Sequence, residues 1–385
     1  MNMATALSIL GILCLLAACH PFVTYPWSLI ALQALRPAKR SRPDSIPVAD
    51  LTCAICVCAY NEERGIARKV ENLLALRARE AGLEILVYVD GASDRTAEIL
   101  REYESQIDLH IATERRGKTY GMNLLASKAR APILIFTDAN VLMDMECVRD
   151  FRRYFADPEI GCVCGNLVYT NDDASVTASS GSAYWRFEEA IKKLEMESGS
   201  MMGADGSVFA IRRSLHNPPP EHIIDDMYVS LMILCNGYRV IQANDAFAYE
   251  ESVVSAGEEF RRKIRIACQA FNVHRLIWPH LRRLDGITLY KYVSHKLIRW
   301  FTIYLLAMSA LAFDAALIVA GHARVAAALV ICMAGALLLG LFSSMKPFAQ
   351  IAGIISAFAG TGLGVWRSLR GERYQTWTPA ASIRK

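Results

Sequence analysis

Long apolar segments at both ends of the chain constrain its fold more than any other feature. Residues 4–33 are almost free of charge, and three further apolar runs fill residues 300–320, 325–342 and 348–366. A helix needs roughly 20 consecutive apolar residues to cross a bilayer, and each C-terminal run is close to that length. Residues 44–285, between these segments, have the mixed composition of a globular domain. The sequence therefore predicts a membrane protein with one water-soluble domain.

The overall composition agrees with this division and narrows the choice of partners. Hydrophobic residues make up 53% of the 385 residues, above the roughly 45–50% apolar content of average soluble domains. The net charge is only +4, and the basic residues cluster beside the apolar segments, which indicates lipid headgroups rather than nucleic acid as partners. The 11 cysteines are an odd number, which argues against a disulfide framework in a cytoplasmic domain. Five of them lie in strand-like apolar stretches and are expected to pack as buried thiols rather than to bind metal: Cys53, Cys56, Cys58, Cys162 and Cys164.

The N-terminal apolar segment, residues 1–35, is expected to form one transmembrane helix. It has no Lys or Arg before Arg36, so it lacks the basic start of a secretory signal. Pro21 and Pro26 would kink this helix or divide it into a span and an interfacial piece. A basic run follows at residues 36–43, and positive charge is retained on the cytoplasmic side of membranes. The soluble domain is therefore predicted to be cytoplasmic, in a multi-pass protein of the inner (plasma) membrane.

The C-terminal region, residues 300–370, is predicted to contain two or three spans. The preceding segment 286–299 mixes basic and aromatic residues, which is typical of a helix at the membrane interface. If all three apolar runs cross, the basic tail 371–385 ends outside, against the positive-inside rule. If one run is re-entrant or interfacial, the tail stays inside. Glycines make the last run the most irregular of the three: Gly360, Gly362 and Gly364.

Strand and helix patterns alternate along the first part of the soluble domain, 44–285. Apolar, strand-like stretches occur at residues 51–60, 83–90, 107–113 and 132–138. Amphipathic helical patterns separate them, at residues 61–80, 93–105 and 117–129. Continuous apolar strands separated by helices imply a mostly parallel sheet covered on both faces. The predicted fold class is therefore α/β and Rossmann-like, with added transmembrane and interfacial α-helices.

Polar side chains follow all four strands at the point where each strand ends: Tyr60, Asn61 and Glu62; Asp90; Arg115, Arg116 and Lys118; Asp138. Parallel strands deliver such groups to one edge of the sheet, where doubly wound folds bind nucleotides. Asp138 stands with Asn140 just after a fully apolar strand. Both residue types favour turns, and both offer the oxygen ligands that hard divalent cations prefer. This stretch alone leaves a turn and a metal site as alternatives.

The order and spacing of several motifs resemble family 2 glycosyltransferases of the GT-A fold, in their membrane-embedded polysaccharide-synthase branch. The resemblance covers nearly the whole chain. It is carried by these stretches: "AYNEE" at 59–63, "VDGASDRT" at 89–96, "RRGKTYGMN" at 115–123, "FTDAN" at 136–140, "GADGSVFAIRR" at 203–213, "IIDDMYVSLMILCNGYRV" at 223–240 and "RRKIRI" at 261–266.

The resemblance implies a site for a UDP-sugar donor. Seven residues would contact the donor nucleotide: Tyr60, Asn61, Glu62, Asp90, Lys118, Asp138 and Arg265. Asp138 and Asn140 stand at the family's D-x-D position, which implies a divalent cation, Mg²⁺ or Mn²⁺, at the diphosphate. Asn140 replaces the second carboxylate, and its neutral amide oxygen is the weaker ligand. Metal binding is therefore expected to depend mainly on Asp138 and the phosphates.

The acidic pair Asp225 and Asp226 matches the family's general base, and Asp226 is the favoured member. A neighbouring carboxylate raises the pKa of one member of such a pair and makes it a better base. The alternative is that both cap the following helix. Three residues are expected at the acceptor: Asp205 in "GADG", Trp185 as a stacking ring, and Arg262. Arg262 and Ile266 stand where relatives carry the Gln and Trp of Q-x-x-R-W, which puts processive polymer synthesis in question.

The function implied is an inverting transfer of a hexose from a UDP-sugar to a glycan or lipid-linked acceptor at the membrane, in exopolysaccharide or cell-surface polysaccharide synthesis. One alternative is transfer of a single sugar to a polyprenyl phosphate or a lipid-linked intermediate. Another is an inactive nucleotide-binding scaffold of an export complex. Few predicted spans are available for a polymer channel, so a homo-oligomer or an export partner is expected. Membrane lipids are the remaining expected partner.

Overall fold

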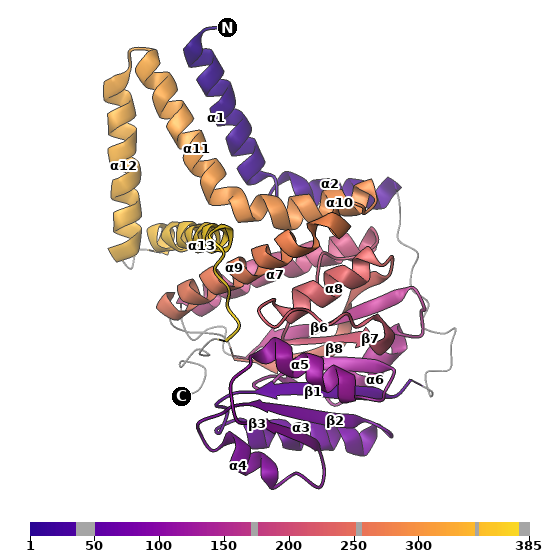
Figure 1. Cartoon of the computed structure of the whole chain (residues 1–385). Coiled ribbons are helices and arrows are strands. Elements are labelled where there is room, and N and C mark those ends of the chain that lie inside the picture. The colour runs from indigo at the N-terminus through magenta and orange to yellow at the C-terminus, as the bar shows by residue number, and fades with distance from the viewer. Residues whose placement is uncertain (36–50, 171–175, 252–255, 343–345, 377–385) are drawn as a thin grey trace. The chain divides into compact units, whose positions relative to one another are not determined.

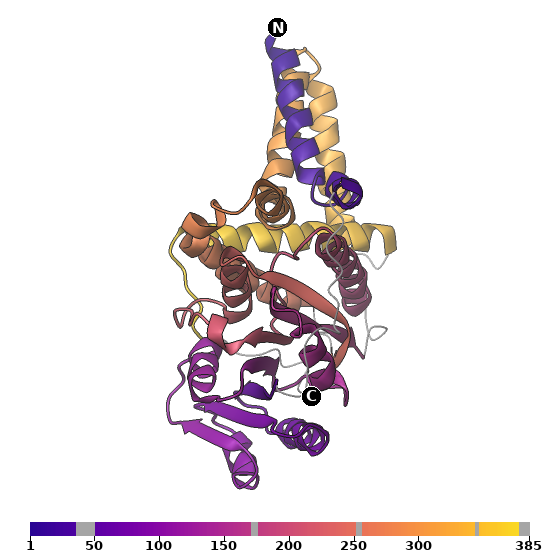
Figure 2. The ribbon, with the colours of Figure 1, turned by 90° about the vertical axis from the view of Figure 1, so that its right-hand side faces the viewer.

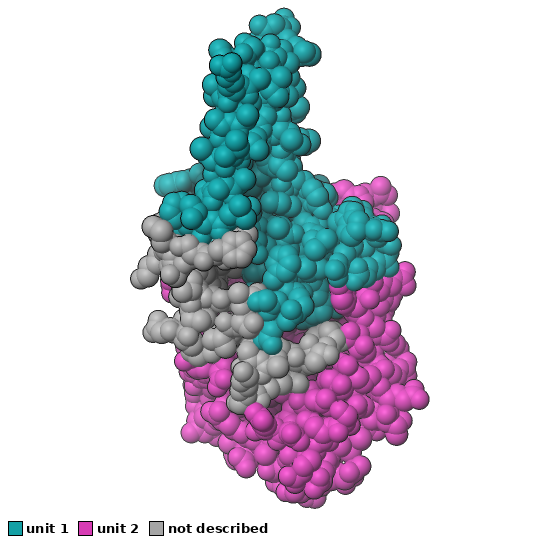
Figure 3. Space-filling model, turned by 90° about the vertical axis from the view of Figure 1, so that its left-hand side faces the viewer, with its two compact units in different colours: residues 1–31, 256–271, 286–372 teal, residues 32–255, 272–285, 373–385 magenta. Residues whose placement is uncertain are grey.

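The computed structural model of the chain describes residues 1–35, 51–170, 176–251, 256–342 and 346–376. The basic run at 36–43 and the last basic residues, Arg384 and Lys385, lie outside the described part. The chain divides into two compact units, coloured separately in Figure 3. Unit 1 comprises residues 1–31, 256–271 and 286–372, and unit 2 comprises 32–255, 272–285 and 373–385. Residues 256–271, which the sequence analysis includes in the globular domain, thus group with the apolar helices.

Unit 2 is built on one eight-stranded sheet with the strand order β3-β2-β1-β4-β7-β6-β8-β5. The strands are β1 Cys53–Ala59, β2 Glu84–Asp90, β3 Asp108–Ala112, β4 Ile133–Asp138, β5 Leu142–Met143, β6 Ile160–Tyr169, β7 Val208–Arg212 and β8 Arg239–Glu250. The four predicted strands β1–β4 are parallel to one another, as expected. β7 runs antiparallel to both β4 and β6, so the complete sheet is mixed rather than purely parallel.

Helices cover both faces of the sheet, which is why its central strands read as continuous apolar runs. The helices of unit 2 are α3 Ile66–Arg79, α4 Thr96–Arg101, α5 Lys118–Lys128, α6 Cys147–Tyr154, α7 Val176–Glu197 and α8 Asp225–Cys235, with a short 3-10 turn at Arg213–Leu215. Ile55 and Val57 of β1 share one core with α3 and α6. Cys58 and Tyr88 face α5 instead, where a side chain at Gly121 would collide with both. The α/β fold class is confirmed by this arrangement (Figure 1).

The cysteines of the sheet are core residues, as predicted. Cys53, Cys56, Cys162 and Cys164 are buried, and Cys58 is half-buried. Burial raises the pKa of the Cys53 thiol to about 12. Among the described residues, no group of three or more His, Cys, Asp or Glu side chains is arranged to hold a metal. The burial of these thiols agrees with the packing role of small apolar side chains.

Unit 1 is helical. It comprises α1 Met3–Cys19, most of α2 Thr24–Leu35, the first part of α9 Ala256–Leu281, α10 Gly286–Tyr292, a π-helical turn Val293–Leu297, α11 Ile298–Val319, α12 Ala323–Phe342 and α13 Lys346–Leu369. Within it, α1 and α12 each lie beside α11 (Figures 1 and 2). In the described part of the chain, two helical segments are long and apolar enough to cross a membrane, Gly286–Val319 and Ala323–Gly340.

The N-terminal segment is not one straight helix. α1 and α2 meet at an angle of 62°, and Pro21 lies in the break, as the sequence suggested. The bend is held by His20, whose Nδ1 lies 2.7 Å from Thr24 Oγ1 and whose Nε2 lies 3.0 Å from Ser294 Oγ. Counted as one bent span, this pair brings the candidate spans to three.

α13 is a single continuous helix, and its glycines serve close packing inside unit 1. A Cβ atom at Gly364 would collide with the backbone of α9, and one at Gly362 would collide with Ile303 of α11. Glycine permits such approach because it has no side chain. α13 is thus a continuous helix, but among the described helices it is not one of those long and apolar enough to cross a membrane, in agreement with the prediction that the last run is the least regular span.

Candidate active site

The parallel strands bring the predicted polar strand ends to one edge of the sheet in unit 2. Cys58 of β1 is in register with Tyr88 of β2 and with Asp138 of β4. Asp90 and Asp138 therefore end the strands on either side of β1, and Tyr60 directly follows β1, at the same edge of the sheet. This is the edge at which doubly wound sheets bind their ligands.

Asp90 anchors the loop that precedes α5. Its carboxylate is 3% exposed and accepts hydrogen bonds from the backbone N–H groups of Arg116, at 2.7 Å, and Gly117, at 3.0 Å. Gly117 has a φ of 92°, and a Cβ there would collide with the carbonyl oxygen of Gln375. Gln375 Nε2 donates to the carbonyl oxygen of Arg116 at 3.1 Å. Asp90 thus sets the shape of this loop, and a contact with the donor nucleotide stays a prediction.

Two side chains after β1 join this edge to neighbouring loops. The guanidinium of Arg115 stacks over the Tyr60 ring, 3.5 Å from its centroid. Asn61 has a φ of 53°, a conformation that Asn tolerates better than most residues. Its Oδ1 accepts the Ser93 N–H at 2.8 Å. Next to it, the backbone N–H of Glu62 donates to Thr96 Oγ1 at 2.7 Å. The loops that follow β1 and β2 are thus joined by hydrogen bonds, and together they form the rim of the site.

Lys118 is the central cation of the site. Its Nζ lies 2.6 Å from Asp138 Oδ1 and 3.3 Å from the carbonyl oxygen of Gly206. Burial would lower the pKa of Lys118, but the carboxylates of Asp138, Asp225 and Asp226 outweigh it and raise that pKa. Lys118 is therefore held protonated among carboxylates. Lys118 is predicted to contact the nucleotide. In the structure its ammonium group contacts Asp138, the predicted metal ligand.

The turn after β4 carries the two predicted metal ligands. Asp138 is partly exposed, with 32% of its side chain accessible, and its backbone N–H donates to the carbonyl oxygen of Ser207 at 3.1 Å. Asn140 Nδ2 donates to Glu250 Oε1 at 3.0 Å, and Ser207 Oγ donates to Glu250 Oε2 at 3.2 Å. Because Glu250 engages the amide nitrogen, the Asn140 carbonyl oxygen is the atom left for a cation. A carboxylate and an amide oxygen fit a hard divalent ion.

Asp225 and Asp226 begin α8. Asp225 is 5% exposed, and its Oδ2 has no hydrogen-bond partner among the described residues. Asp226 Oδ1 accepts the Met227 N–H at 2.5 Å, and its Oδ2 lies against Gly206, where any Cβ would collide with it. Burial first, and then the charge of Asp225, raise the pKa of Asp226 to about 7. The N-cap residue of α8 is Ile224, so neither aspartate occupies the capping position, and both lie in the first turn of the helix. The carboxylate of Asp226 is suited to proton transfer near neutral pH.

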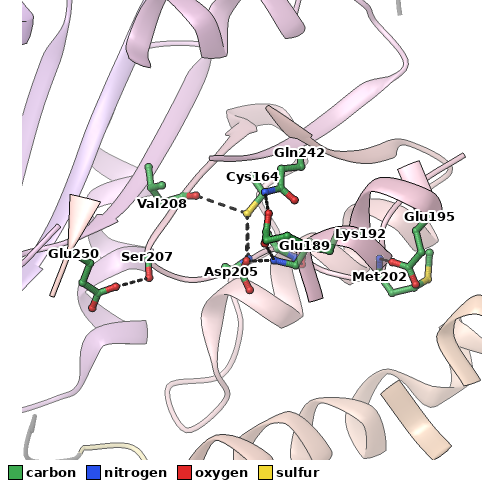
Figure 4. A network of polar contacts seen from close by, with 12 residues as sticks. Cys164, Glu189, Lys192, Glu195, Met202, Asp205, Ser207, Val208, Gln242 and Glu250 are labelled. Carbon is green, nitrogen blue, oxygen red and sulfur yellow. Dashed lines mark hydrogen bonds and ion pairs between the residues drawn. The ribbon is translucent and has the colours of Figure 1, made fainter. Parts of the chain in front are cut away.

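Asp205 is joined to a buried ammonium group. Figure 4 shows Lys192 of α7 in contact with both Asp205 and Glu189. Lys192 Nζ lies 2.8 Å from Glu189 Oε1 and also donates to Asp205 Oδ2. The Asp205 N–H donates to Cys164 Sγ at 3.3 Å. Glu189 accepts a further hydrogen bond from Gln242 Nε2.

The comparison with known families agrees with this geometry. Residues 54–217 match the family model described as Glycosyl transferase family 2. The chain is thus similar to family 2 glycosyltransferases over residues 54–217. The matched part runs from β1 to just beyond β7, and it therefore includes the rim, Lys118, Asp138 and Asp205.

Curated relatives of this chain are named as polysaccharide synthases. It is 25% identical over 194 residues to the poly-β-1,6-N-acetyl-D-glucosamine synthase of Staphylococcus aureus (strain COL), a match that covers 48% of this chain and 46% of the relative. It is 22% identical over 240 residues to the synthase of the same name from Staphylococcus epidermidis, covering 59% of this chain and 56% of the relative. The chain thus spans about half the length of the curated relatives it matches.

A solved structure shares the fold. The mannosyltransferase PcManGT from Pyrobaculum calidifontis, in complex with GDP-Man and Mn²⁺, matches with a TM-score of 0.71 and 22% identity. The match covers 95% of this chain and 99% of that chain. The GT-A fold predicted from the motifs is therefore confirmed.

The structure brings most of the predicted site residues together within unit 2, but not all of them. Arg262 and Arg265 lie on the part of α9 that belongs to unit 1. There Arg262 Nη1 pairs with Glu259 Oε2 at 3.4 Å, and Arg265 Nη1 donates to Gln269 Oε1 at 3.0 Å. Trp185 lies in α7, in a stretch whose side chains are outside the described part. The roles of these three residues stay predictions.

Three charged residues at the site were not predicted from the sequence: Lys69, Lys192 and Glu250. Lys69 had a visible signal, because it lies on the core face of α3 between Ile66 and Leu73. It is fully buried, and its Nζ donates to Thr137 Oγ1 at 3.2 Å and to the carbonyl oxygen of Val141. It thereby holds both ends of the turn that carries Asp138. Lys192 and Glu250 look like ordinary surface charges in the sequence.

Lys69 should make stability depend on pH. Burial lowers the pKa of Lys69 from 10.5 to about 7, an effect partly offset by Asp138. Between these values the unfolded chain binds the proton and the folded chain does not, so stability rises with pH, by about 1.4 kcal/mol per pH unit. We expect the unfolding free energy of the parent minus that of Lys69→Met to increase by this slope from pH 7 to 10. Thermal unfolding of the purified proteins measures it, with Lys128→Met as an exposed control. A difference that does not vary with pH would contradict the assignment.

Proposed function

We propose that this glycosyltransferase moves a hexose from a UDP-sugar to a membrane-presented glycan by a single inverting displacement. The observation that carries the proposal is the grouping of Asp138, Asp225 and Asp226 around Lys118 at the ligand-binding edge of the sheet. Tyr60, Asn61, Glu62, Asp90 and Lys118 would line the donor side. Asp205 would line the acceptor side. The curated relatives support polymer synthesis, and transfer of one sugar to a polyprenyl phosphate is the alternative.

Asp226 is the proposed general base. Its carboxylate would take the proton of the acceptor hydroxyl while that oxygen attacks the anomeric carbon. The bond from this carbon to the diphosphate would break in the same step, and UDP would leave with its electron pair. The raised pKa of Asp226 suits the task, since a base is most effective when its pKa lies near the working pH. Lys118 would donate hydrogen bonds to the phosphates once Asp138 binds the divalent cation in place of Lys118.

Asp138 and Asn140 are the proposed ligands of Mg²⁺ or Mn²⁺. When bound, the cation supplies a positive charge that offsets the charge developing on the leaving diphosphate. Glu250 would orient the Asn140 amide so that its oxygen faces the cation, as outer-shell partners of metal ligands do. The Mn²⁺ bound in the mannosyltransferase with the same fold supports a divalent ion here.

We also propose that the protein is a multi-pass protein of the inner membrane with unit 2 in the cytoplasm. The two apolar helices of the C-terminal region support membrane insertion. UDP-sugars are cytoplasmic, and the acceptor would be presented by lipid or by a growing glycan at the same surface. Two to three spans are few for a polymer channel, so a second copy or an export partner would complete one.

A donor screen tests the function. Membranes that contain the full chain are supplied with UDP-glucose, UDP-galactose, UDP-N-acetylglucosamine, UDP-glucuronate or GDP-mannose, and nucleotide release is measured. We expect release from one UDP-sugar, dependent on Mg²⁺ or Mn²⁺ and abolished by EDTA. The product should be a polymer by gel filtration. A singly glycosylated lipid would favour the alternative acceptor, release from GDP-mannose alone would refute the UDP-sugar donor, and no release with any donor would favour an inactive scaffold.

A further inference from the structure

A cavity of about 270 Å³, lined by both polar and apolar side chains, lies within unit 2, and none of the proposed donor residues is among those that line it. α7 contributes Glu189, Ala190 and Met196 to its lining, and strands β6 and β8 contribute Asn166, Gln242 and Asn244. Gln242 is 5% exposed, so a carboxamide is buried at its wall. Asn166 and Asn244 belong to a strand pair that is already connected, because Asn166 Nδ2 donates to the carbonyl oxygen of Asn244 at 3.2 Å.

The lining has the chemistry of a carbohydrate site. Each carboxamide offers both donors and acceptors, and Glu189 offers acceptors only. Together they match hydroxyl groups, which donate and accept at once. Met196 and Ala190 add the apolar surface that the C–H groups of a sugar ring require. The volume is slightly below the roughly 300–1,000 Å³ of small-molecule sites, so the cavity has room for no more than a short sugar segment.

The charges around the cavity disfavour an anionic ligand. Burial would lower the pKa of Lys192, but Asp205 and Glu189 hold that pKa well above its usual value, so Lys192 remains a cation. Both carboxylates contact Lys192, and Lys193 adds one positive charge to the lining of the cavity. The net charge of Lys192, Lys193, Asp205 and Glu189 together is zero. A phosphate or a nucleotide would find no surplus positive charge here, whereas a neutral polyol needs none.

The cavity is connected to the proposed base through a short series of contacts. Asp226 Oδ2 lies against Gly206, the neighbour of Asp205. Asp205 bonds Lys192, Lys192 bonds Glu189, and Glu189 bonds Gln242 at the cavity wall (Figure 4). The proposed donor residues Tyr60, Asp90 and Lys118 stand on other elements, just after β1, at the end of β2 and at the start of α5. Seen from Asp226, the cavity therefore lies in the direction of Asp205.

We propose that this cavity is a glycan subsite, which binds a neutral sugar unit of the acceptor chain beyond the one that reacts at Asp226. The inference rests on the proposed function for its biological meaning, because only a transferase that extends or decorates a glycan needs a second sugar contact. Glu189 and Gln242 bind hydroxyl groups there, and Lys192 keeps Glu189 in place.

Binding of oligosaccharides to the full chain in detergent or nanodiscs tests the subsite without turnover. The probes are cellotetraose and a β-1,6-linked N-acetylglucosamine tetrasaccharide, measured by calorimetry and saturation-transfer NMR, with inorganic phosphate as the anionic comparison. Ala190→Phe fills the cavity from an exposed helix position, and Asn244→Leu removes one exposed carboxamide. Ala78→Phe, at an exposed alanine of α3, is the matched control for Ala190→Phe. Melting temperatures verify that all variants are folded.

We expect at least one tetrasaccharide to bind the parent, and to bind both cavity variants at least about tenfold more weakly. Ala78→Phe should bind like the parent, and UDP affinity should be the same in all four proteins. The subsite is refuted if neither probe binds the parent, if the cavity variants bind like the parent, or if phosphate displaces the sugar. Failure of the donor screen with intact sugar binding would instead refute the proposed donor chemistry, so the two outcomes remain distinct.

Discussion

Asp226→Asn should lower kcat by about a thousandfold while leaving the affinity for UDP unchanged. General base catalysis contributes typically 10²–10⁴ in rate, and the amide keeps the shape of the side chain but cannot accept the proton. Asp226 stands at the start of α8 and against Gly206 and is less buried than Asp225, so it is the carboxylate that the proposed acceptor next to Asp205 would reach. UDP release and UDP binding, measured on the same preparation, separate chemistry from donor affinity.

The pH profile provides a second readout of the same carboxylate. Burial and the charge of Asp225 raise the pKa of Asp226 to about 7, so kcat/KM should rise with pH along an acid limb near neutrality. Asp225→Asn removes one of the two causes and should move this limb to lower pH, but not to the value of a free carboxyl, because burial persists. Asp108→Asn, an exposed residue of β3, is the control. Full activity in Asp226→Asn, or an unmoved limb in Asp225→Asn, would contradict the assignment.

Glu250 should control metal affinity through Asn140. Removal of an outer-shell partner typically weakens metal binding about 10- to 100-fold, so Glu250→Ala should bind Mn²⁺ that much more weakly in the presence of UDP. Electron paramagnetic resonance of free Mn²⁺ measures this directly, without turnover. Glu104→Ala, an exposed glutamate next to α4, should bind Mn²⁺ like the parent. Equal affinity in Glu250→Ala and the parent would remove Glu250 from the site.

A double substitution makes the pairing of Asn140 and Glu250 specific. Asn140→Asp alone places a second carboxylate against Glu250, and like charges in contact oppose each other. With Glu250→Gln added, the new amide can donate to the new aspartate, so the hydrogen bond returns with reversed direction. We expect the double variant to bind Mn²⁺ more tightly than Asn140→Asp alone. Independent effects of the two changes would show that the residues do not act as a pair.

The local patterns of the sequence predicted the first half of the soluble domain well. The apolar strands at 51–60, 83–90, 107–113 and 132–138 form as parallel neighbours, because a strand buried on both faces has a recognisable composition. The antiparallel β7 did not follow from any pattern, since strand direction depends on how the chain returns to the sheet. The bend between α1 and α2 was visible in Pro21, but its angle was not.

The residues of the candidate site likewise divide into those that local motifs indicate and those that only the fold brings together. Asp138, Asp225 and Asp226 could be predicted as candidates because each stands at an element boundary within a short motif, and the family match, residues 54–217, includes Asp138. Glu250 was not found, because its partner Asn140 is 110 residues away. Lys192 likewise meets Asp205 only after α7 packs beside β6 and β8.

The sequence by itself thus determined the division into apolar helices and an α/β domain, the first four strands and the residue types at their ends. These features depend on local periodicity and composition, which can be determined from the sequence before the fold is known. Only the tertiary structure decided which charge meets which: Lys118 with Asp138, Glu250 with Asn140, and Lys192 between Asp205 and Glu189. The physical reason is that a buried charge is stable only beside a partner, and packing between distant segments chooses that partner.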